Sequence, residues 1–276
     1  MRPGLIGIFD SGVGGLTVAD RVRQELPGVP FLYFGDTAHV PYGNRSAEEV
    51  RHLVSAIARH LVASGAQVLV MACNTSSALA LDLVRAWSPV PVIGIIEAAS
   101  RAAVQATRNG VVGVIANPLT AGSGAYEEAC ARASSEAGER AGGVRVLPVG
   151  CPRLVPLVEA GEVRSPSARA ALMEYLAPLQ DEGIDTLVLG CTHYPFLVPL
   201  ITEILGSGVR IIDPAVYVVA ELVKSGWFPP NTEEALPLYQ VSGEPLDFDR
   251  MASRLLGRLV TGTTRVDLGA GVCVSS

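Results

Sequence analysis

The chain has 276 residues, of which 49% are hydrophobic and 17% charged, so it can bury one large core or two smaller ones and is not a disordered protein. Its formal net charge of −6 argues against a basic surface for nucleic acid, and no apolar run approaches the ~18 residues of a membrane span. The N-terminal segment leads into an apolar strand without the pattern of a signal peptide, so we expect a cytoplasmic protein.

A glycine-rich turn follows the first predicted strand, Leu5–Phe9, and precedes a helical run over 16–26. The turn, Gly12-Val13-Gly14-Gly15, is not a dinucleotide fingerprint because Thr17 stands where the third glycine belongs, and no P-loop lysine follows. Either a tight turn or an anion site fits it. Asp10, at the end of the strand, is a candidate site carboxylate.

The second predicted helix, 46–63, has a clear start signal. Ser46 with Glu49 three residues later forms a capping box, and an apolar stripe at helical spacing follows. His52 and His60 fall outside this stripe, so we expect both to be solvated.

Strands and helices continue to alternate along the chain. We expect further strands at 30–34, 68–71, 90–95, 111–115, 144–149, 184–189, 209–212 and 238–242, helices at 76–87, 121–133, 165–180, 215–225 and 247–259, and a surface loop at 134–143. This alternation is typical of an α/β fold with mostly parallel sheets and helices on their faces.

The chain contains an internal repeat. The segment 29–35 matches 144–150 and the segment 92–98 matches 209–215, with an offset that stays near 116 residues. The repeat predicts two pseudo-symmetric α/β lobes with the active site in the cleft between them. We assign 1–98 plus 208–276 to the first lobe, with the C-terminal part packed on it, and 99–207 to the second.

Two cysteines occupy matched positions in this repeat, since Cys73 and Cys191 each follow a predicted strand. Ligands bind outside the carboxyl ends of the strands in open α/β sheets, so both thiols fall where chemistry is usually done. A facing pair of thiols fits a disulfide, which a reducing compartment disfavours, a zinc site completed by His193 and Asp10, or two acid/base groups on opposite faces of one carbon. The third arrangement inverts a stereocentre.

The other cysteines have no such pairing. Cys130 lies within a predicted helix and Cys273 in the tail, so both are expected to be inert, whereas Cys151 follows a strand at the repeat position of Asp36.

Inversion of an amino acid through pyridoxal phosphate would need a Schiff-base lysine. The single lysine of the chain, Lys224, lies outside both repeats, so we do not expect this route.

Six motifs together carry a family resemblance: F-D-S-G-V-G-G-L-T-V, G-D-T-A-H-V-P-Y-G, A-C-N-T-S-S-A, G-A-Y-E-E-A, V-P-L-V-E-A-G and L-G-C-T-H-Y-P. In this order, from residue 5 to about 220, the chain resembles the glutamate racemases, which need no cofactor and make D-glutamate for peptidoglycan. An aspartate racemase of the same fold is the nearest alternative. A two-lobed amino-acid-binding protein without catalysis is the alternative from another class.

The resemblance implies roles for individual residues. Cys73 and Cys191 match the family's two bases, and Asp10, His193 and Glu159 match the groups that assist them. The substrate-binding positions are Ser11, Pro41, Tyr42, Gly43, Asn74, Thr75, Asn117, Thr120 and Thr192. Asn117 departs from the family, which commonly has threonine there, so we expect altered affinity and retained activity. The resemblance also implies glutamate as substrate, and we expect a homodimer. The spacing of the candidate ligands disfavours a metal, and the net charge and hydropathy predict neither a nucleic-acid nor a membrane partner.

Overall fold

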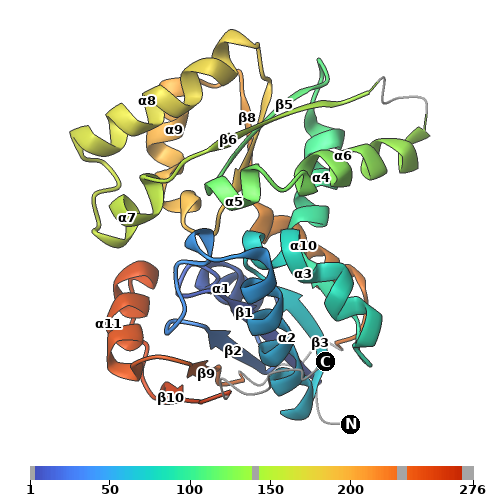
Figure 1. Ribbon diagram of the computed structural model, residues 1–276, viewed down its shortest axis with the longest axis vertical. Helices are drawn as coiled ribbons and strands as arrows, with labels where there is room; N and C mark the ends of the chain where they lie inside the picture. Colours follow the sequence, from blue (N-terminus) through green and yellow to red (C-terminus); the bar gives the residue numbers. More distant parts are fainter. Residues whose placement is uncertain (1–3, 139–142, 229–234, 269–276) are drawn as a thin grey trace.

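The computed structural model describes residues 4–138, 143–228 and 235–268, which form two lobes, each built on a parallel β-sheet with helices on both faces (Figure 1). The predicted α/β class is confirmed. Cys273 and the middle of the loop expected at 134–143 lie outside the described residues.

The first lobe holds a sheet of six parallel strands in the order β10-β9-β2-β1-β3-β4. The strands are β1 (Leu5–Asp10), β2 (Phe31–Gly35), β3 (Ala66–Met71), β4 (Val92–Gly94), β9 (Leu238–Val241) and β10 (Thr264–Arg265), and the helices are α1 (Leu16–Glu25), η1 (Tyr42–Asn44), α2 (Ala47–Ala63), α3 (Asn74–Trp87) and α11 (Pro245–Leu256). Side chains alternate across the sheet. Ile6 and Ile8 face the core beneath α1, while Phe9 faces the core beneath α2 and α3.

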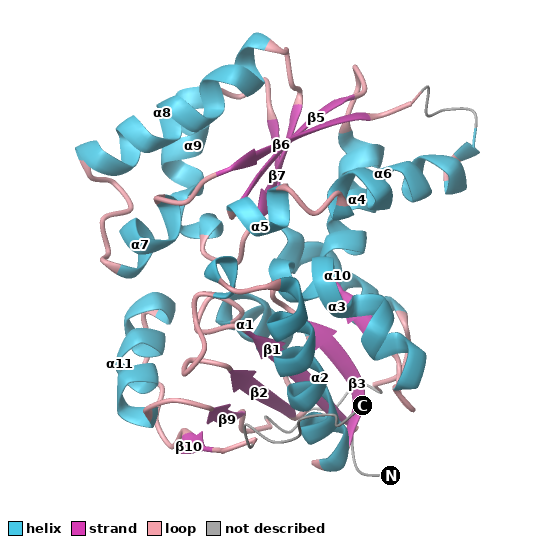
Figure 2. Cartoon of the chain, in the orientation of Figure 1, coloured by secondary structure: helices cyan, strands magenta, loops and turns pink. Residues whose placement is uncertain are grey.

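The second lobe holds a sheet of four parallel strands in the order β6-β5-β7-β8. The strands are β5 (Val111–Ala116), β6 (Arg145–Gly150), β7 (Thr186–Gly190) and β8 (Arg210–Ile212), and the helices are α5 (Pro118–Ala121), α6 (Ala125–Glu136), α7 (Leu154–Glu159), α8 (Pro166–Asp181), η3 (Tyr194–Leu197) and α9 (Val198–Leu205). Figure 2 shows α7, α8 and α9 on one side of this sheet and α6 on the other.

The internal repeat is visible in the topology, because the order β2-β1-β3-β4 of the first sheet recurs as β6-β5-β7-β8 in the second. One detail of the predicted division is wrong. The boundary at 208 gives the strand at 209–212 to the first lobe, but β8 pairs with β7 in the second sheet. Its repeat partner β4 pairs with β3 in the first sheet, so the repeat itself requires this placement. The remaining division of the chain into two lobes stays a prediction.

Two helices connect the lobes. α4 (Ile95–Ala106) and α10 (Pro214–Lys224) pack against each other, α10 also packs on α1, and α4 packs on α6 and β7. One continuous apolar core therefore runs from β1 through these helices to β5 and β7. This shared core orients the two sheets so that the carboxyl ends of their strands meet (Figure 1).

Several sequence expectations need correction. The strand expected at 90–95 is shorter, because α4 begins at Ile95; this Ala-rich helix was not predicted. The helix expected at 121–133 is two helices, α5 and α6, and α6 continues to Glu136 into the expected loop. The capping box at Ser46 is confirmed. His52 is exposed as expected, but His60 is half-buried, with Nε2 2.7 Å from Gln240 Oε1 on β9.

Candidate active site

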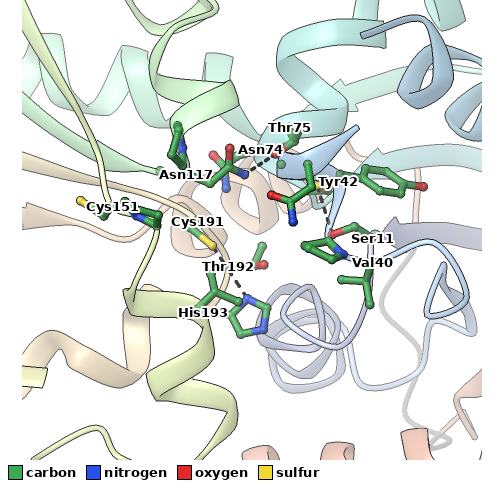
Figure 3. A pocket seen from close by; sticks show the side chains of 18 of the residues that line it. Ser11, Val40, Tyr42, Asn74, Thr75, Asn117, Cys151, Cys191, Thr192 and His193 are labelled. Carbon is green, nitrogen blue, oxygen red and sulfur yellow. Dashed lines mark hydrogen bonds between the residues drawn. The ribbon is translucent and has the colours of Figure 1, made fainter. Parts of the chain in front are cut away.

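A cavity of about 290 Å³ lies between the lobes, at the carboxyl ends of strands from both sheets (Figure 3). Residues one or two positions after strands β1, β3, β5, β6 and β7 all contribute to its wall. The lining residues are Ser11, Val40, Pro41, Tyr42, Gly43, Asn44, Cys73, Asn74, Thr75, Asn117, Pro118, Cys151, Pro152, Val155, Pro156, Glu159, Gly190, Cys191, Thr192 and His193. The predicted cleft between the two lobes is confirmed.

Cys73 belongs to the first lobe and is the N-cap residue of α3. Its Sγ accepts a hydrogen bond from the backbone N–H of Ser76 at 3.5 Å and lies 3.7 Å from Ser11 Oγ. The residue is only 5% exposed. Burial, with the nearby charge of Asp10, raises the pKa of this thiol to about 11. Cys73 therefore stays protonated at neutral pH.

Asp10 ends β1 behind the cavity wall and does not line the cavity. Its Oδ2 accepts a hydrogen bond from the backbone N–H of Gly12 at 3.1 Å, and the Gly12 carbonyl accepts one from Tyr33 Oη at 2.9 Å. Oδ1 is buried without a hydrogen-bond partner among the described residues. Asp10 acts on Cys73 through its charge, which helps to keep the thiol protonated.

Cys191 belongs to the second lobe and forms a chain of contacts with His193 and Glu159. Its Sγ lies 3.8 Å from His193 Nδ1, and His193 Nε2 lies 3.2 Å from Glu159 Oε1. The second distance is that of an ion pair, although the ring N–H is not aligned for a hydrogen bond. Burial alone lowers the pKa of His193, but Cys191 and Glu159 outweigh it and raise this pKa to about 10. The imidazole is therefore positively charged at neutral pH.

The two thiols thus have different surroundings. A carboxylate stands behind Cys73, and an imidazolium stands beside Cys191. The first arrangement favours a neutral thiol, and the second can donate a hydrogen bond to a thiolate. The buried third thiol, Cys151, donates to the carbonyl of Val149 at 3.4 Å, and burial raises its pKa to about 12, so it also stays protonated.

A hydrogen-bond network crosses between the lobes at Asn117. Its Nδ2 donates to Thr75 Oγ1 at 2.7 Å, and its Oδ1 accepts from the backbone N–H of Thr120 at 3.0 Å, which caps α5. Thr75 and Thr120 are linked through their hydroxyls at 2.9 Å. Thr120 is buried beneath the cavity wall and lines no part of the cavity, so it supports Thr75 and Asn117.

The loop that carries Pro41, Tyr42 and Gly43 is fixed by the buried carboxylate of Asp36. Asp36 accepts hydrogen bonds from Tyr42 Oη and from Ser242 Oγ, both at 2.6 Å, and lies 2.7 Å from His39 Nδ1. Because Ser242 directly follows β9, the C-terminal part of the first lobe holds this wall of the cavity in place.

The glycine turn meets the opposite lobe. A β-carbon at Gly14 would lie 2.2 Å from Thr192 Oγ1 and 2.6 Å from His193 Nδ1. The turn is glycine-rich here because the lobes approach closely. None of Gly12, Gly14 and Gly15 has a positive φ, so close packing at Gly14, and not the backbone freedom of a tight turn, requires glycine here.

All predicted site residues except Asp10 and Thr120 line the cavity. Eight further residues line the cavity although the sequence predicts no role for them: Val40, Asn44, Pro118, Cys151, Pro152, Val155, Pro156 and Gly190. Val40, Val155, Pro156 and Gly190 lie inside the quoted motifs, so the motifs contained that signal. Asp36 and Gly14 also lie inside quoted motifs, but their roles depend on contacts with distant residues, Ser242 for Asp36 and Thr192 for Gly14.

The geometry also bears on the alternatives. Lys224 is exposed at the end of α10 and does not line the cavity. Within the described residues, no three His, Cys, Asp or Glu side chains are grouped so that they could hold one metal ion. No helix in the described part of the chain has the length and apolar character needed to cross a membrane.

Comparisons with known proteins identify the family of the chain. The sequence profile of the Asp/Glu/Hydantoin racemase family matches residues 16–222. The chain belongs to this family. A glutamate racemase of Desulforudis audaxviator is 43% identical over 278 residues, covering 97% of this chain and 99% of that protein.

Solved structures of racemases have the same fold. The crystal structure of a glutamate racemase isoform from Bacillus anthracis superposes with a TM-score of 0.90 at 35% identity, covering 97% of this chain and 99% of that one. A glutamate racemase from Francisella tularensis, solved in complex with D-glutamate, gives a TM-score of 0.87 at 30% identity, covering 98% of this chain and 100% of that one. The resemblance to glutamate racemases stated from the motifs is confirmed.

Proposed function

We propose that the protein is a glutamate racemase, which interconverts L- and D-glutamate by proton transfer at the α-carbon. The observation that carries this proposal is the pair of thiols, one from each lobe, that line one cavity and differ in their electrostatic surroundings. The relatives named glutamate racemase cover nearly the whole chain, and one related structure contains D-glutamate.

The proposed reaction uses one thiol as base and the other as acid. For L-glutamate, the Cys191 thiolate removes the α-proton, and Cys73 delivers its own proton to the opposite face of the same carbon. The C–H electron pair stays on carbon and then forms the new C–H bond. The products are D-glutamate, a Cys191 thiol and a Cys73 thiolate, so atoms and charge balance. The reverse reaction exchanges the two roles.

His193 and Asp10 assist these thiols in the proposed mechanism. The imidazolium of His193, oriented by Glu159, donates to the Cys191 thiolate and holds it next to the substrate. The Asp10 carboxylate favours the protonated form of Cys73. The enzyme thus starts with one thiolate and one thiol, as a two-base inversion requires.

The α-proton is far less acidic than a thiol, so the site must stabilise the negative charge that develops when it leaves. Preorganised donors at the substrate carboxylate are the usual means. Hydroxyl and amide groups of Ser11, Thr75, Asn117 and Thr192 are placed on the cavity wall for this task. Because these donors come from both lobes, they surround a substrate that binds between the lobes.

The proposed role follows from the product. D-glutamate is made for peptidoglycan, so we place the protein in cell-wall synthesis and the maintenance of cell shape, in the cytoplasm. The family resemblance supports a homodimer, which sedimentation velocity measures directly. The proposed partners include neither nucleic acid nor membrane, in keeping with the net charge of −6.

The test is incubation of the purified protein with L-glutamate, D-glutamate and the two enantiomers of aspartate, with no cofactor added and a chelator present. We expect circular dichroism to show loss of optical activity from either enantiomer of glutamate and not from aspartate. Faster racemisation of aspartate would identify an aspartate racemase. Loss of activity on chelation, restored by zinc, would support a metal site.

A further inference from the structure

One buried tyrosine contacts both cysteine-bearing strand ends. Tyr126 is the second residue of α6 and is only 1% exposed. Its ring packs against Gly190, where an added β-carbon would lie 3.2 Å from Tyr126 Cε2. Its hydroxyl donates a hydrogen bond to Asn74 Oδ1 at 2.7 Å. Gly190 precedes Cys191 and Asn74 follows Cys73, so this side chain bridges the two halves of the site.

The hydrogen bond from Tyr126 fixes the orientation of the Asn74 amide. Asn74 lines the cavity and is 3% exposed. With Oδ1 occupied by the phenol, Nδ2 is the free end of the amide, and it is buried without a partner among the described residues. A buried amide donor without a partner is costly, and an anionic oxygen of a ligand would satisfy it. The opposite orientation would turn an oxygen toward the anion and repel it.

We propose that Tyr126 is a positioning residue for substrate binding. It holds the Asn74 amide so that Nδ2 donates to a carboxylate oxygen of the substrate in the cavity. The inference rests on the proposed function for the identity of that substrate. It also gives a role to the motif G-A-Y-E-E-A at 124–129, none of whose residues lines the cavity.

The test is Tyr126→Phe, which keeps the ring against Gly190 and removes only the hydroxyl. The amide of Asn74 then loses its fixed orientation, so we expect KM for both enantiomers to rise roughly tenfold, with kcat within about twofold of the wild-type value. The matched control is Tyr175→Phe. Tyr175 is also buried and accepts a hydrogen bond from Arg153 Nε at 2.9 Å, but it does not line the cavity. The KM of Tyr175→Phe should therefore equal that of the wild type.

A double-mutant cycle separates positioning from a general loss of structure. If Tyr126 acts through Asn74, Tyr126→Phe should have no further effect on KM in an Asn74→Ala background. Additive effects of the two changes, or an unchanged KM in Tyr126→Phe while the wild type racemises glutamate, would overturn the inference. Asn74→Leu tests the same point with Tyr126 intact, and an unchanged KM there would also overturn it. An inactive wild type would instead contradict the proposed function.

Discussion

The backbone of Gly14 in the first lobe packs directly on the side chain of Thr192 in the second, and a single added methyl group would lie 2.2 Å from Thr192 Oγ1. Thr192 lies between Cys191 and His193 in the sequence. This contact therefore helps to fix the position of the Cys191 thiol relative to the first lobe. Real β-carbons do not approach other atoms so closely. Any side chain at position 14 must therefore displace Thr192 or His193.

Gly14→Ala should lower kcat/KM by about a hundredfold, because a displacement of about 1 Å in a catalytic group costs that much. Racemisation rates measured by circular dichroism test this expectation. Gly12→Ala is the matched control in the same turn. A β-carbon at Gly12 would meet Val40 Cγ2 at 3.5 Å, an ordinary contact, so its activity should stay within about threefold of the wild type. Equal losses in both variants would contradict the steric argument.

The charge of His193 predicts how activity depends on pH. Its pKa is raised to about 10, so the imidazolium is present below that pH and is lost above it. We expect kcat/KM to fall as pH rises through about 10. His193→Gln should slow turnover roughly a hundredfold and lose this limb of the profile. A His193→Gln enzyme with near-normal kcat would remove His193 from the mechanism.

The same pKa shift predicts how stability depends on pH. The folded protein holds the proton of His193 more tightly than the unfolded chain, where the pKa is 6.5. The stability from this group is therefore complete below pH 6.5 and is lost as pH rises toward about 10. Between pH 6.5 and 10, the Tm of the wild type should fall further than the Tm of His193→Gln. His52→Gln, at an exposed histidine, should behave like the wild type.

Much of this fold could be predicted from the sequence because its signals are local. Apolar runs with glycine or proline at their ends mark the strands, and the capping box at Ser46 marks α2. The repeat then predicts that the two sheets are built alike, and the strand order that they share comes from the structure. α4 was missed because it begins directly after β4 without a turn, so that its first apolar residues, Ile95 and Ile96, continue the apolar pattern of the strand.

Contacts between distant segments could not be predicted in this way. Ser242 reaches Asp36 from 206 positions away, and no periodicity relates the two residues. The same holds for Tyr126 and Asn74, which lie in different lobes. The motifs contain most of the residues that line the cavity, whereas the contacts of the residues behind its wall depend on how the lobes pack.

Asn117 offers a prediction about substrate affinity. Asn117→Ala removes the donor to Thr75 and the cap of α5, so KM should rise about fivefold to tenfold and stability should fall by about 1 kcal/mol. Asn117→Thr restores a cap and a hydroxyl and should recover most of both losses. Ser165→Ala removes the N-cap of α8, away from the cavity, and should lower stability without a change in KM. If Ser165→Ala also raised KM, the rise in KM of Asn117→Ala would have to be explained by the loss of stability.

The two-base arrangement predicts where hydrogen isotopes go. In deuterated water the thiol of Cys73 exchanges its proton for deuterium. L-glutamate gives its α-proton to Cys191 and receives a deuteron from Cys73 on the other face. Early in the reaction, the D-glutamate formed should therefore carry deuterium at the α-carbon, while the remaining L-glutamate keeps protium. Mass spectrometry of the separated enantiomers measures both.

A single base that serves both faces would return part of the original protium to the product, and substantial protium in early D-glutamate would contradict the mechanism. The cysteine variants test the same step. Cys73→Ser and Cys191→Ser should each abolish racemisation, because a hydroxyl is a far poorer base than a thiolate. Cys130→Ser is the control, since Cys130 is buried in α6 and does not line the cavity. Its activity should be unchanged, and a Cys73→Ser enzyme as active as Cys130→Ser would exclude Cys73 as the second base.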